Sequence, residues 1–313
     1  MHKRWIRSIS SSKKKTKKKT CNEFEEFWKN SYTQYIHGIP TVFYKSELSK
    51  KQRHDRLDPV LLYDDSTYNP ATKVRFVCTS DTHNLTERFT KPVPYGDVLL
   101  HAGDFTQEGE MCQVEQFSEW LESLPHRIKI VIAGNHDLTL DAGRFPQNHI
   151  RDAFIGRLQR SCIYLEDSTA IINGIKIYGT PWIPEYNGKW GFELKREDEC
   201  SAKWREIPSD TDILLSHTPP VGHGDRCADS SRAGCVNLLQ QVQLRIKPQY
   251  QVFGHVQEDS GITTDGQTIF INAAMCNEKM KPVLDPVVFD MDKKSEEMLL
   301  VSSTSQWNAL TNV

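Results

Sequence analysis

The sequence predicts a mixed α/β fold in which one large domain takes up most of the 313-residue chain. Three observations support this prediction. Short apolar runs alternate with helical patterns from residue 73 onward, two hairpin signals follow in the second half, and each polar motif comes directly after an apolar run. Strands that alternate with helices and then form hairpins are typical of a mixed sheet covered by helices.

The first half of this region predicts three strands and a helix. The apolar runs 74–78, 97–101 and 128–132 are strand-like, and each ends at a polar turn. Between the second and third runs, apolar residues at helical spacing predict an amphipathic helix over 111–124, which Pro125 stops. The apolar residues of this pattern are Val114, Phe117, Leu121 and Leu124.

The second half predicts hairpins, two further strands and a helix. Runs 170–172 and 175–178 flank Asn173-Gly174, the strongest short hairpin signal, and a second hairpin turns at Asp265-Gly266. Strands at 212–215 and 250–253 enclose a helix over about 236–246, and 287–289 closes the pattern.

Charge divides the chain into three segments. Residues 1–20 contain nine Lys and Arg and no acidic residue; the whole chain is at −2, so the rest carries −11. We expect residues 1–20 to be a disordered basic tail that makes at most weak contact with an anionic surface, residues 21–72 to be an extension packed on the domain, and residues 73–313 to form the domain.

Composition favours a cytoplasmic protein, with a nuclear location through the basic tail as the alternative. The basic N-terminus is followed by no apolar core, so it is not a secretory signal, and no apolar run is long enough to cross a membrane. The eight cysteines form no CxxC pair, which argues against a zinc finger or a disulfide framework.

Ligand-type side chains follow several predicted strands, at the edge where open α/β sheets bind ligands. The set is Asp81, His83, Asp104, Asn135, His136, His217 and His255. Carboxylate, imidazole and amide donors without a thiolate suit a harder metal ion, and so many donors are too numerous for one ion. The sequence therefore predicts two divalent metal ions, with Mn²⁺ as the first expectation and Fe, Ni, Co or Zn as alternatives.

The ordered motifs resemble those of the calcineurin-like metallophosphoesterase superfamily, whose signature is DxH, GD, GNH[DE], H and GHxH. They stand here as Asp81-Thr82-His83, Gly103-Asp104, Gly134-Asn135-His136-Asp137, His217 and Gly254-His255-Val256-Gln257. Motifs such as 179–182 and 217–222 are similar to the animal metallophosphoesterase-domain-containing branch, which acts on phosphodiesters. The resemblance implies a four-layer α/β/β/α sandwich with two mixed sheets.

The resemblance also implies a role for each motif residue. Asp81 and His83 would hold the first metal ion, Asp104 would bridge both ions, and the second ion would be held by Asn135, His217 and His255. His136 would act on the leaving oxygen as an acid or transition-state stabiliser, and Asp137 would orient His136.

Gln257 departs from the family pattern, because it stands where the second His of GHxH should hold the first metal ion. An amide oxygen is neutral and a weaker donor than imidazole for these ions. We therefore expect a weakened first metal site and reduced activity.

Three further residues are candidates for substrate contact. His223 and Asp225 lie in the loop after His217, where a Gly-rich turn is an equally good interpretation. Trp182 begins an aromatic stretch that continues through Trp190, and a purine would stack there, although a wedge in the core is the commoner role.

The function expected from the resemblance is metal-dependent hydrolysis of a small phosphodiester, a cyclic nucleotide being the first expectation. Three alternatives stay open. A nucleotide-binding pseudoenzyme with a regulatory or scaffolding role fits Gln257. A protein phosphatase needs a more open groove than the aromatic stretch suggests, and a nuclease fits the basic tail but not the acidic remainder.

Overall fold

A computed structural model describes residues 55–58, 62–145, 148–296 and 299–301. The predicted basic tail, residues 1–20, lies outside the described residues, as does most of the predicted extension. Of that extension, β1 (Asp55–Arg56) pairs with a strand of the domain, and Leu57 and Leu62 pack against its core. The division at residue 72 stays a prediction.

The larger sheet is mixed and has eight strands in the order β1-β12-β13-β11-β10-β7-β6-β15. Its central strands β13, β11, β10 and β7 run parallel to one another, whereas β12 pairs antiparallel with β13, β6 with β7, and β15 with β6. The bounds are β6 (Ser168–Ile172), β7 (Ile175–Thr180), β10 (Ile213–Ser216), β11 (Tyr250–Phe253), β12 (Gly261–Thr264), β13 (Ile269–Asn272) and β15 (Leu299–Val301).

The smaller sheet has five strands in the order β14-β2-β3-β4-β5. Of these, β2, β3, β4 and β5 run parallel to one another. β14 returns antiparallel to β2 at the edge. The bounds are β2 (Lys73–Thr79), β3 (Val98–His101), β4 (Ile128–Val131), β5 (Ile163–Tyr164) and β14 (Val287–Asp292). A separate short pair, β8 (Ile183–Pro184) and β9 (Glu193–Leu194), lies beside the main sheets.

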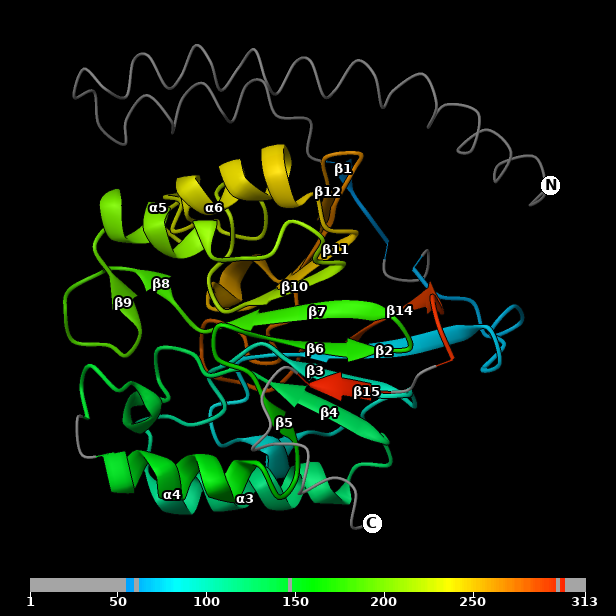
Figure 1. The fold of residues 1–313 in the computed structure, drawn as a ribbon. Helices are drawn as coiled ribbons and strands as arrows, with labels where there is room; N and C mark the ends of the chain where they lie inside the picture. The colour runs from blue at the N-terminus through cyan, green and yellow to red at the C-terminus, as the bar shows by residue number, and fades with distance from the viewer. Residues whose placement is uncertain (1–54, 59–61, 146–147, 297–298, 302–313) are drawn as a thin grey trace.

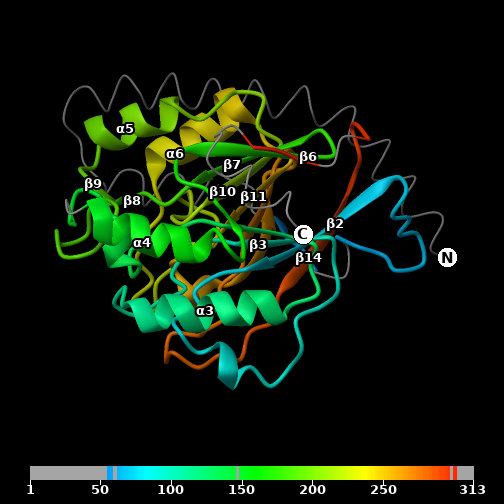
Figure 2. The same cartoon turned by 60° about the horizontal axis from the view of Figure 1, so that its bottom comes forward.

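The two sheets pack face to face, with helices on the outer face of each (Figures 1 and 2). Helices α3 (Met111–Ser123) and α4 (Asn148–Leu158) cover the smaller sheet, and α5 (Asp198–Arg205) and α6 (Val236–Gln241) cover the larger one. Alternate residues of β2 show why: Phe76 points into the core between the sheets, and Val77 points to the helices. The predicted four-layer α/β/β/α sandwich is confirmed.

Turn chemistry and helix ends agree with the sequence in most places. Asn173 and Gly174 both have left-handed backbone, with φ of 48° and 77°, as a two-residue hairpin turn requires. The helix predicted over 111–124 ends at Ser123, directly before Leu124-Pro125. The helix predicted over 236–246 differs: α6 ends at Gln241 and continues as a π-helical turn, Val242–Ile246. Among the described residues, no helix is both long and apolar enough to cross a membrane.

A buried ion pair joins the antiparallel edge strand β14 to β2. Arg75 is only 6% exposed, and its guanidinium contacts both carboxylate oxygens of Asp290, through Nε at 2.8 Å and Nη2 at 3.0 Å. The hydrogen bonds that Arg75 donates to Asp290 raise the pKa of Arg75, since they favour its charged form. This pair stabilises the edge strand β14 against β2, and β2 leads directly to Asp81.

We predict that Asp290→Ala lowers the free energy of unfolding by about 3 kcal/mol, because it leaves a buried guanidinium without its main partner. Lys91→Ala removes an exposed ion pair with Asp285 and should cost less than about 1 kcal/mol. Denaturant unfolding monitored by circular dichroism measures both. Equal losses for the two variants would show that the Arg75 pair contributes no more than a surface pair.

Candidate metal centre

Every candidate metal ligand follows the carboxyl end of a parallel strand, and both sheets contribute. Asp81 and His83 follow β2, Asp104 follows β3, Asn135 follows β4, and His217 and His255 follow β10 and β11. Backbone contacts join these turns: the Asp81 N–H donates to the Gly103 carbonyl (2.9 Å), and the Gly254 N–H donates to the His217 carbonyl (3.2 Å). Contacts between the sheets bring both sets to one place: Nδ1 of His217 lies 2.7 Å from the Ala102 carbonyl, and the His255 N–H donates to Asp81.

Left-handed backbone turns these side chains into the site. Asp81, His83, Asp104 and His255 have φ of 53°, 44°, 56° and 68°, a region that residues with a side chain rarely adopt. Such strained conformations cluster at functional sites because the surrounding structure holds them there.

Glycine is required where two of these turns touch. A Cβ on Gly254 would lie 1.9 Å from Oδ2 of Asp81 and 2.1 Å from Oγ of Ser80. A Cβ on Gly134 would lie 2.3 Å from Oδ1 of Asp104. The glycines of the GNH and GH motifs therefore make room for the carboxylates of the neighbouring turns.

One group of potential ligands gathers around His217. The ligand atoms of Asp104, His217 and His255 all lie within 4.8 Å of one another. Oδ1 of Asn135 lies 3.0 Å from Nε2 of His217 and 2.8 Å from Nδ1 of His255. This is the full set expected for the second metal ion.

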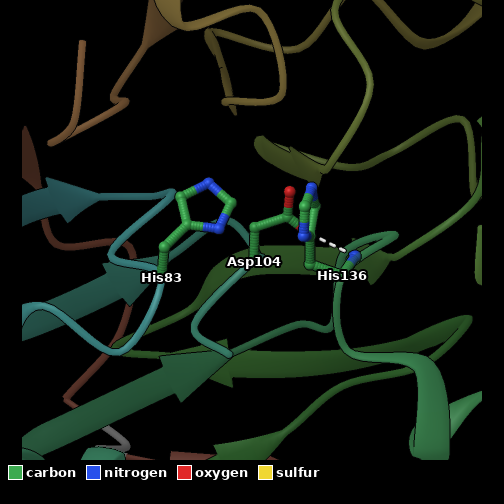
Figure 3. Close-up of side chains that lie close together, drawn as sticks. All are labelled: His83, Asp104 and His136. Carbon is green, nitrogen blue, oxygen red and sulfur yellow. Dashed lines mark hydrogen bonds between the residues drawn. The ribbon is translucent and has the colours of Figure 1, made fainter. Parts of the chain in front are cut away.

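A second group forms on the other side of the same carboxylate. His83, Asp104 and His136 also place ligand atoms within 4.8 Å of one another, and Figure 3 shows their side chains converging. Asp81, expected here, lies alongside: its Oδ1 is 3.8 Å from Nε2 of His83, and its carboxylate accepts the His255 N–H. The sequence did not predict that His136 would stand this close to the first metal position.

Charge and burial in this cluster fit a bound cation. Asp81, His83 and His217 are fully buried, so a cation among them would compensate carboxylate charge that water cannot reach. Burial lowers the pKa of His83 and brings that of His255 to about 3, so both imidazoles are neutral, as ligation requires.

The ionised groups of the cluster are compensated in pairs. Burial opposes ionisation of Asp104, but the neighbouring histidines, His217 first, outweigh it and hold the pKa of Asp104 below its usual range. The Asp104 carboxylate in turn raises the pKa of His217 to about 9 against the effect of burial, at an Nε2–Oδ2 distance of 3.3 Å. The positive charge of protonated His217 thus compensates the buried carboxylate, and a bound metal cation would do the same.

Gln257 lies directly beside His83. Its Nε2 is 2.7 Å from Nε2 of His83 and 3.8 Å from Sδ of Met280. The amide therefore stands next to the imidazole of the first metal position, which is where the family pattern has a histidine.

Asp137 does not orient His136, and this prediction is corrected. Its buried carboxylate accepts hydrogen bonds from the backbone N–H groups of Gly134 (2.8 Å), Asp104 (3.0 Å) and Thr106 (2.9 Å). It therefore joins the turn after β3 to the turn after β4. The His136 ring instead places Nδ1 2.8 Å from the backbone carbonyl of Gln107.

The three candidate substrate residues have structural partners instead. His223 is buried, stacks on Phe270 with ring centroids 3.7 Å apart, and pairs with Thr263. Asp225 is buried in an ion pair with Arg232.

Trp182 donates from Nε1 to Asp167 (2.7 Å) and packs edge-on against Phe192. The interpretations as a Gly-rich turn and a core wedge describe His223, Asp225 and Trp182 better than substrate contact does.

Sequence reasoning did not single out two neighbours of His136. One is the Gln107 carbonyl, a backbone atom that no side-chain motif marks. The other is Trp190, whose ring centroid lies 4.3 Å from that of His136. Trp190 was visible only as one member of the aromatic stretch that begins at Trp182.

Comparisons with known proteins agree with this geometry. A family model described as calcineurin-like phosphoesterase matches residues 74–259, which contain every candidate ligand. The chain is 44% identical over 239 residues to human metallophosphoesterase domain-containing protein 1, covering 71% of this chain and 72% of the relative.

A UPF0046 protein of Caenorhabditis elegans is 43% identical over 234 residues, covering 70% of this chain and 81% of the relative. A solved crystal structure with 14% identity covers 74% of this chain and 99% of its own, with a TM-score of 0.51. At that identity the solved structure supports the fold alone.

We predict that Gly254→Ala destabilises the protein by about 3 kcal/mol, the upper part of the range for overpacking, because the new Cβ displaces the Asp81 carboxylate. The same variant should retain less Mn²⁺ per chain after dialysis. Gly156→Ala is the matched control, since nothing lies within 4 Å of a Cβ at this exposed position of α4. Metal retention equal to that of the wild type in Gly254→Ala would contradict this account.

Proposed function

This chain belongs to the calcineurin-like phosphoesterase family, and on that premise we propose that it is a dinuclear metal-dependent phosphodiesterase acting on a small nucleotide such as a cyclic nucleotide. Family membership makes the protein a metal-dependent phosphoesterase. The number of ions, the preference for diesters, the nucleotide substrate and the choice of Mn²⁺ are the proposal.

The observation that carries the proposal is the position of Asp104. This one carboxylate belongs to both groups of ligand atoms, with His83 and His136 on one side and His217 and His255 on the other. A carboxylate shared in this way is the arrangement by which two ions are held close enough to act on one phosphoryl group. His83 and Asp81 would hold one ion, and Asn135, His217 and His255 the other.

When bound, such a metal pair supplies positive charge at the phosphoryl oxygens and lowers the pKa of water. The protein's own residues supply orientation and a proton. Because Nδ1 of His136 contacts the Gln107 carbonyl, Nε2 is the ring nitrogen left to hold or give a proton at the leaving oxygen. The backbone N–H of His136 donates to Oδ1 of Asp104 (2.8 Å), which fixes this residue relative to the carboxylate that would bridge the ions.

The substrate class is supported by the motifs of the diester-cleaving branch and by the donor set. Mixed carboxylate, amide and imidazole donors suit Mn²⁺. The loop between β8 and β9 places Trp190 against His136, so one side of the site is covered. A covered site favours a small diester over a phosphopeptide.

A nucleotide-binding pseudoenzyme is the second candidate, and Gln257 is the observation that favours it. Its amide lies 2.7 Å from the His83 nitrogen that would otherwise face a metal ion. An ion would have to compete with this contact, so the first metal site is the weaker of the two in our proposal.

We predict that the metal-stripped protein regains hydrolysis of bis(p-nitrophenyl) phosphate when Mn²⁺ is added, and that Asp104→Ala loses it by about 10²-fold or more, as expected for a preorganised electrostatic group. p-Nitrophenyl phosphate, a monoester, should be cleaved more slowly by the same preparation. Release of p-nitrophenol measures both reactions.

Glu119→Ala, on the exposed side of α3, is the matched acidic control and should retain full activity. Absence of diester cleavage by a folded, Mn²⁺-loaded wild type would favour the nucleotide-binding pseudoenzyme. Equal activity of Asp104→Ala and the wild type would assign the cleavage to a contaminant.

We predict that Gln257→His strengthens Mn²⁺ binding on the order of tenfold and raises turnover, because imidazole is a better donor than an amide at the first site. Glu258→His adds a histidine at the exposed neighbouring position and should change neither. Isothermal titration of Mn²⁺ into stripped protein measures the affinity. If Gln257→His behaves like Glu258→His, position 257 is not part of the metal centre.

A further inference from the structure

We propose that Trp190 is a positioning residue for His136: its indole ring packs against the imidazole and holds Nε2 toward the leaving oxygen of the substrate. This inference rests on the proposed function, since it concerns the group that would protonate that oxygen. Trp190 lies in the loop between β8 and β9, which consists of residues 185–192. Figure 1 shows this loop beside the short strand pair.

Three contacts fix the His136 ring. The Trp190 ring lies at a centroid distance of 4.3 Å and is tilted by 37°. On another side, His83 meets it edge-on at 4.7 Å and 79°. The Gln107 carbonyl, 2.8 Å from Nδ1, sets the direction of the ring nitrogens. Trp190 is the only one of the three that is neither a candidate ligand nor a backbone atom, so it can be changed by itself.

The loop that carries Trp190 is organised around one carboxylate. Glu193 accepts hydrogen bonds from the backbone N–H groups of Tyr186 (2.9 Å), Asn187 (3.1 Å) and Trp190 (3.1 Å). Although partial burial opposes ionisation, these donors hold the pKa of Glu193 below its usual value. The charged carboxylate thus satisfies three backbone N–H groups of the loop.

Arg144 holds the same loop from outside. Its guanidinium donates to the backbone carbonyls of Trp190 (2.5 Å) and Gly188 (2.7 Å) and lies 3.6 Å from the Glu193 carboxylate. A loop fixed by both an anion on its N–H groups and a cation on its carbonyls presents its side chains in one geometry.

The loop is also attached to the segment that carries His136. The Gly191 N–H donates to the carbonyl of Asn135 (3.0 Å), and the Phe192 N–H donates to Oδ2 of Asp141 (2.8 Å). The two residues directly after Trp190 are therefore hydrogen-bonded to residues on both sides of His136 along the chain. A shift of the loop would shift the imidazole.

Packing in the core does not account for Trp190. Phe192 and Trp182, from the same aromatic stretch, pack in the hydrophobic clusters under the helices. Trp190 is half-buried and lies outside the clusters formed by the described residues. A large aromatic residue held at the edge of the site by Glu193 and Arg144 is better explained by the ring that it contacts.

The leaving group provides the test, because a general acid matters most when the leaving oxygen is a poor one. In Trp190→Ala, kcat for a diester with an unactivated phenyl leaving group should fall about tenfold or more, given that small misplacements cost up to about 10²-fold. With p-nitrophenyl the fall should be less than about threefold. KM and bound Mn²⁺ should stay unchanged, and Trp190→Phe should restore most of kcat.

Two controls separate positioning from folding. Tyr186→Ala changes a side chain that is 77% exposed on the same loop and keeps its backbone N–H, so it should have no effect. In a His136→Ala background, Trp190→Ala should cause no further loss for either leaving group. Equal losses for both leaving groups, loss of metal, or a further loss without His136 would overturn the proposal.

A readout without turnover separates this inference from the proposed function. The Trp190 ring current should shift the His136 Cε1–H proton resonance, assigned through His136→Ala, and Trp190→Ala should abolish that shift. An unchanged resonance would contradict the contact whatever the activity. Suppose that the wild type has no diesterase activity but the shift is lost in Trp190→Ala. The proposed function would then be wrong, whereas the contact by which Trp190 positions His136 would be supported.

Discussion

The buried carboxylate of Asp104 is the constraint on which the rest of the centre depends. It is 2% exposed, yet its pKa is held below the usual range, so the fold keeps a charge where burial alone would remove it. Nε2 of His217 at 3.3 Å and the backbone N–H of His136 at 2.8 Å compensate that charge from two sides. Groups that follow strands of both sheets therefore meet at the same carboxylate. The same convergence creates two groups of ligand atoms with one shared member.

Backbone geometry makes this convergence sterically feasible. Left-handed turns at Asp81, Asp104 and His255 direct side chains inward directly after buried strands. Gly134 and Gly254 leave room for carboxylates that a Cβ would displace. Asp137 accepts hydrogen bonds from three backbone N–H groups and so joins the turn after β3 to the turn after β4. The short motifs of the sequence are thus packing requirements as much as chemical ones, and their order follows from the strand topology.

Sequence patterns predicted most of the strands and helices, and the ligand-type residues at the strand ends, for a physical reason: strands, Asn-Gly turns and residues at strand ends are local features. The assignment of those residues as metal ligands stays a prediction. The hairpin at Asn173-Gly174 was predicted correctly, the helix predicted over 111–124 ends one residue earlier, and the layers were implied by the family resemblance and are confirmed. The role of Asp137 was wrong, because the partners of its carboxylate are backbone N–H groups that no motif records. Trp190 and the Gln107 carbonyl were missed for the same kind of reason. Trp190 reaches His136 through a loop whose shape depends on Glu193 and Arg144, and Gln107 contributes a backbone atom.

The central claim is that Asp104 is shared by two metal ions, with the ion beside Gln257 the more weakly held. Electron paramagnetic resonance of stripped protein titrated with Mn²⁺ tests this most directly. At low Mn²⁺ the account predicts the signal of an isolated ion at the His217 side. Near saturation it predicts that this signal gives way to that of an exchange-coupled pair, because a bridging carboxylate couples the two spins. A signal of isolated ions that persists at saturation, or binding of a single ion per chain, would contradict the account.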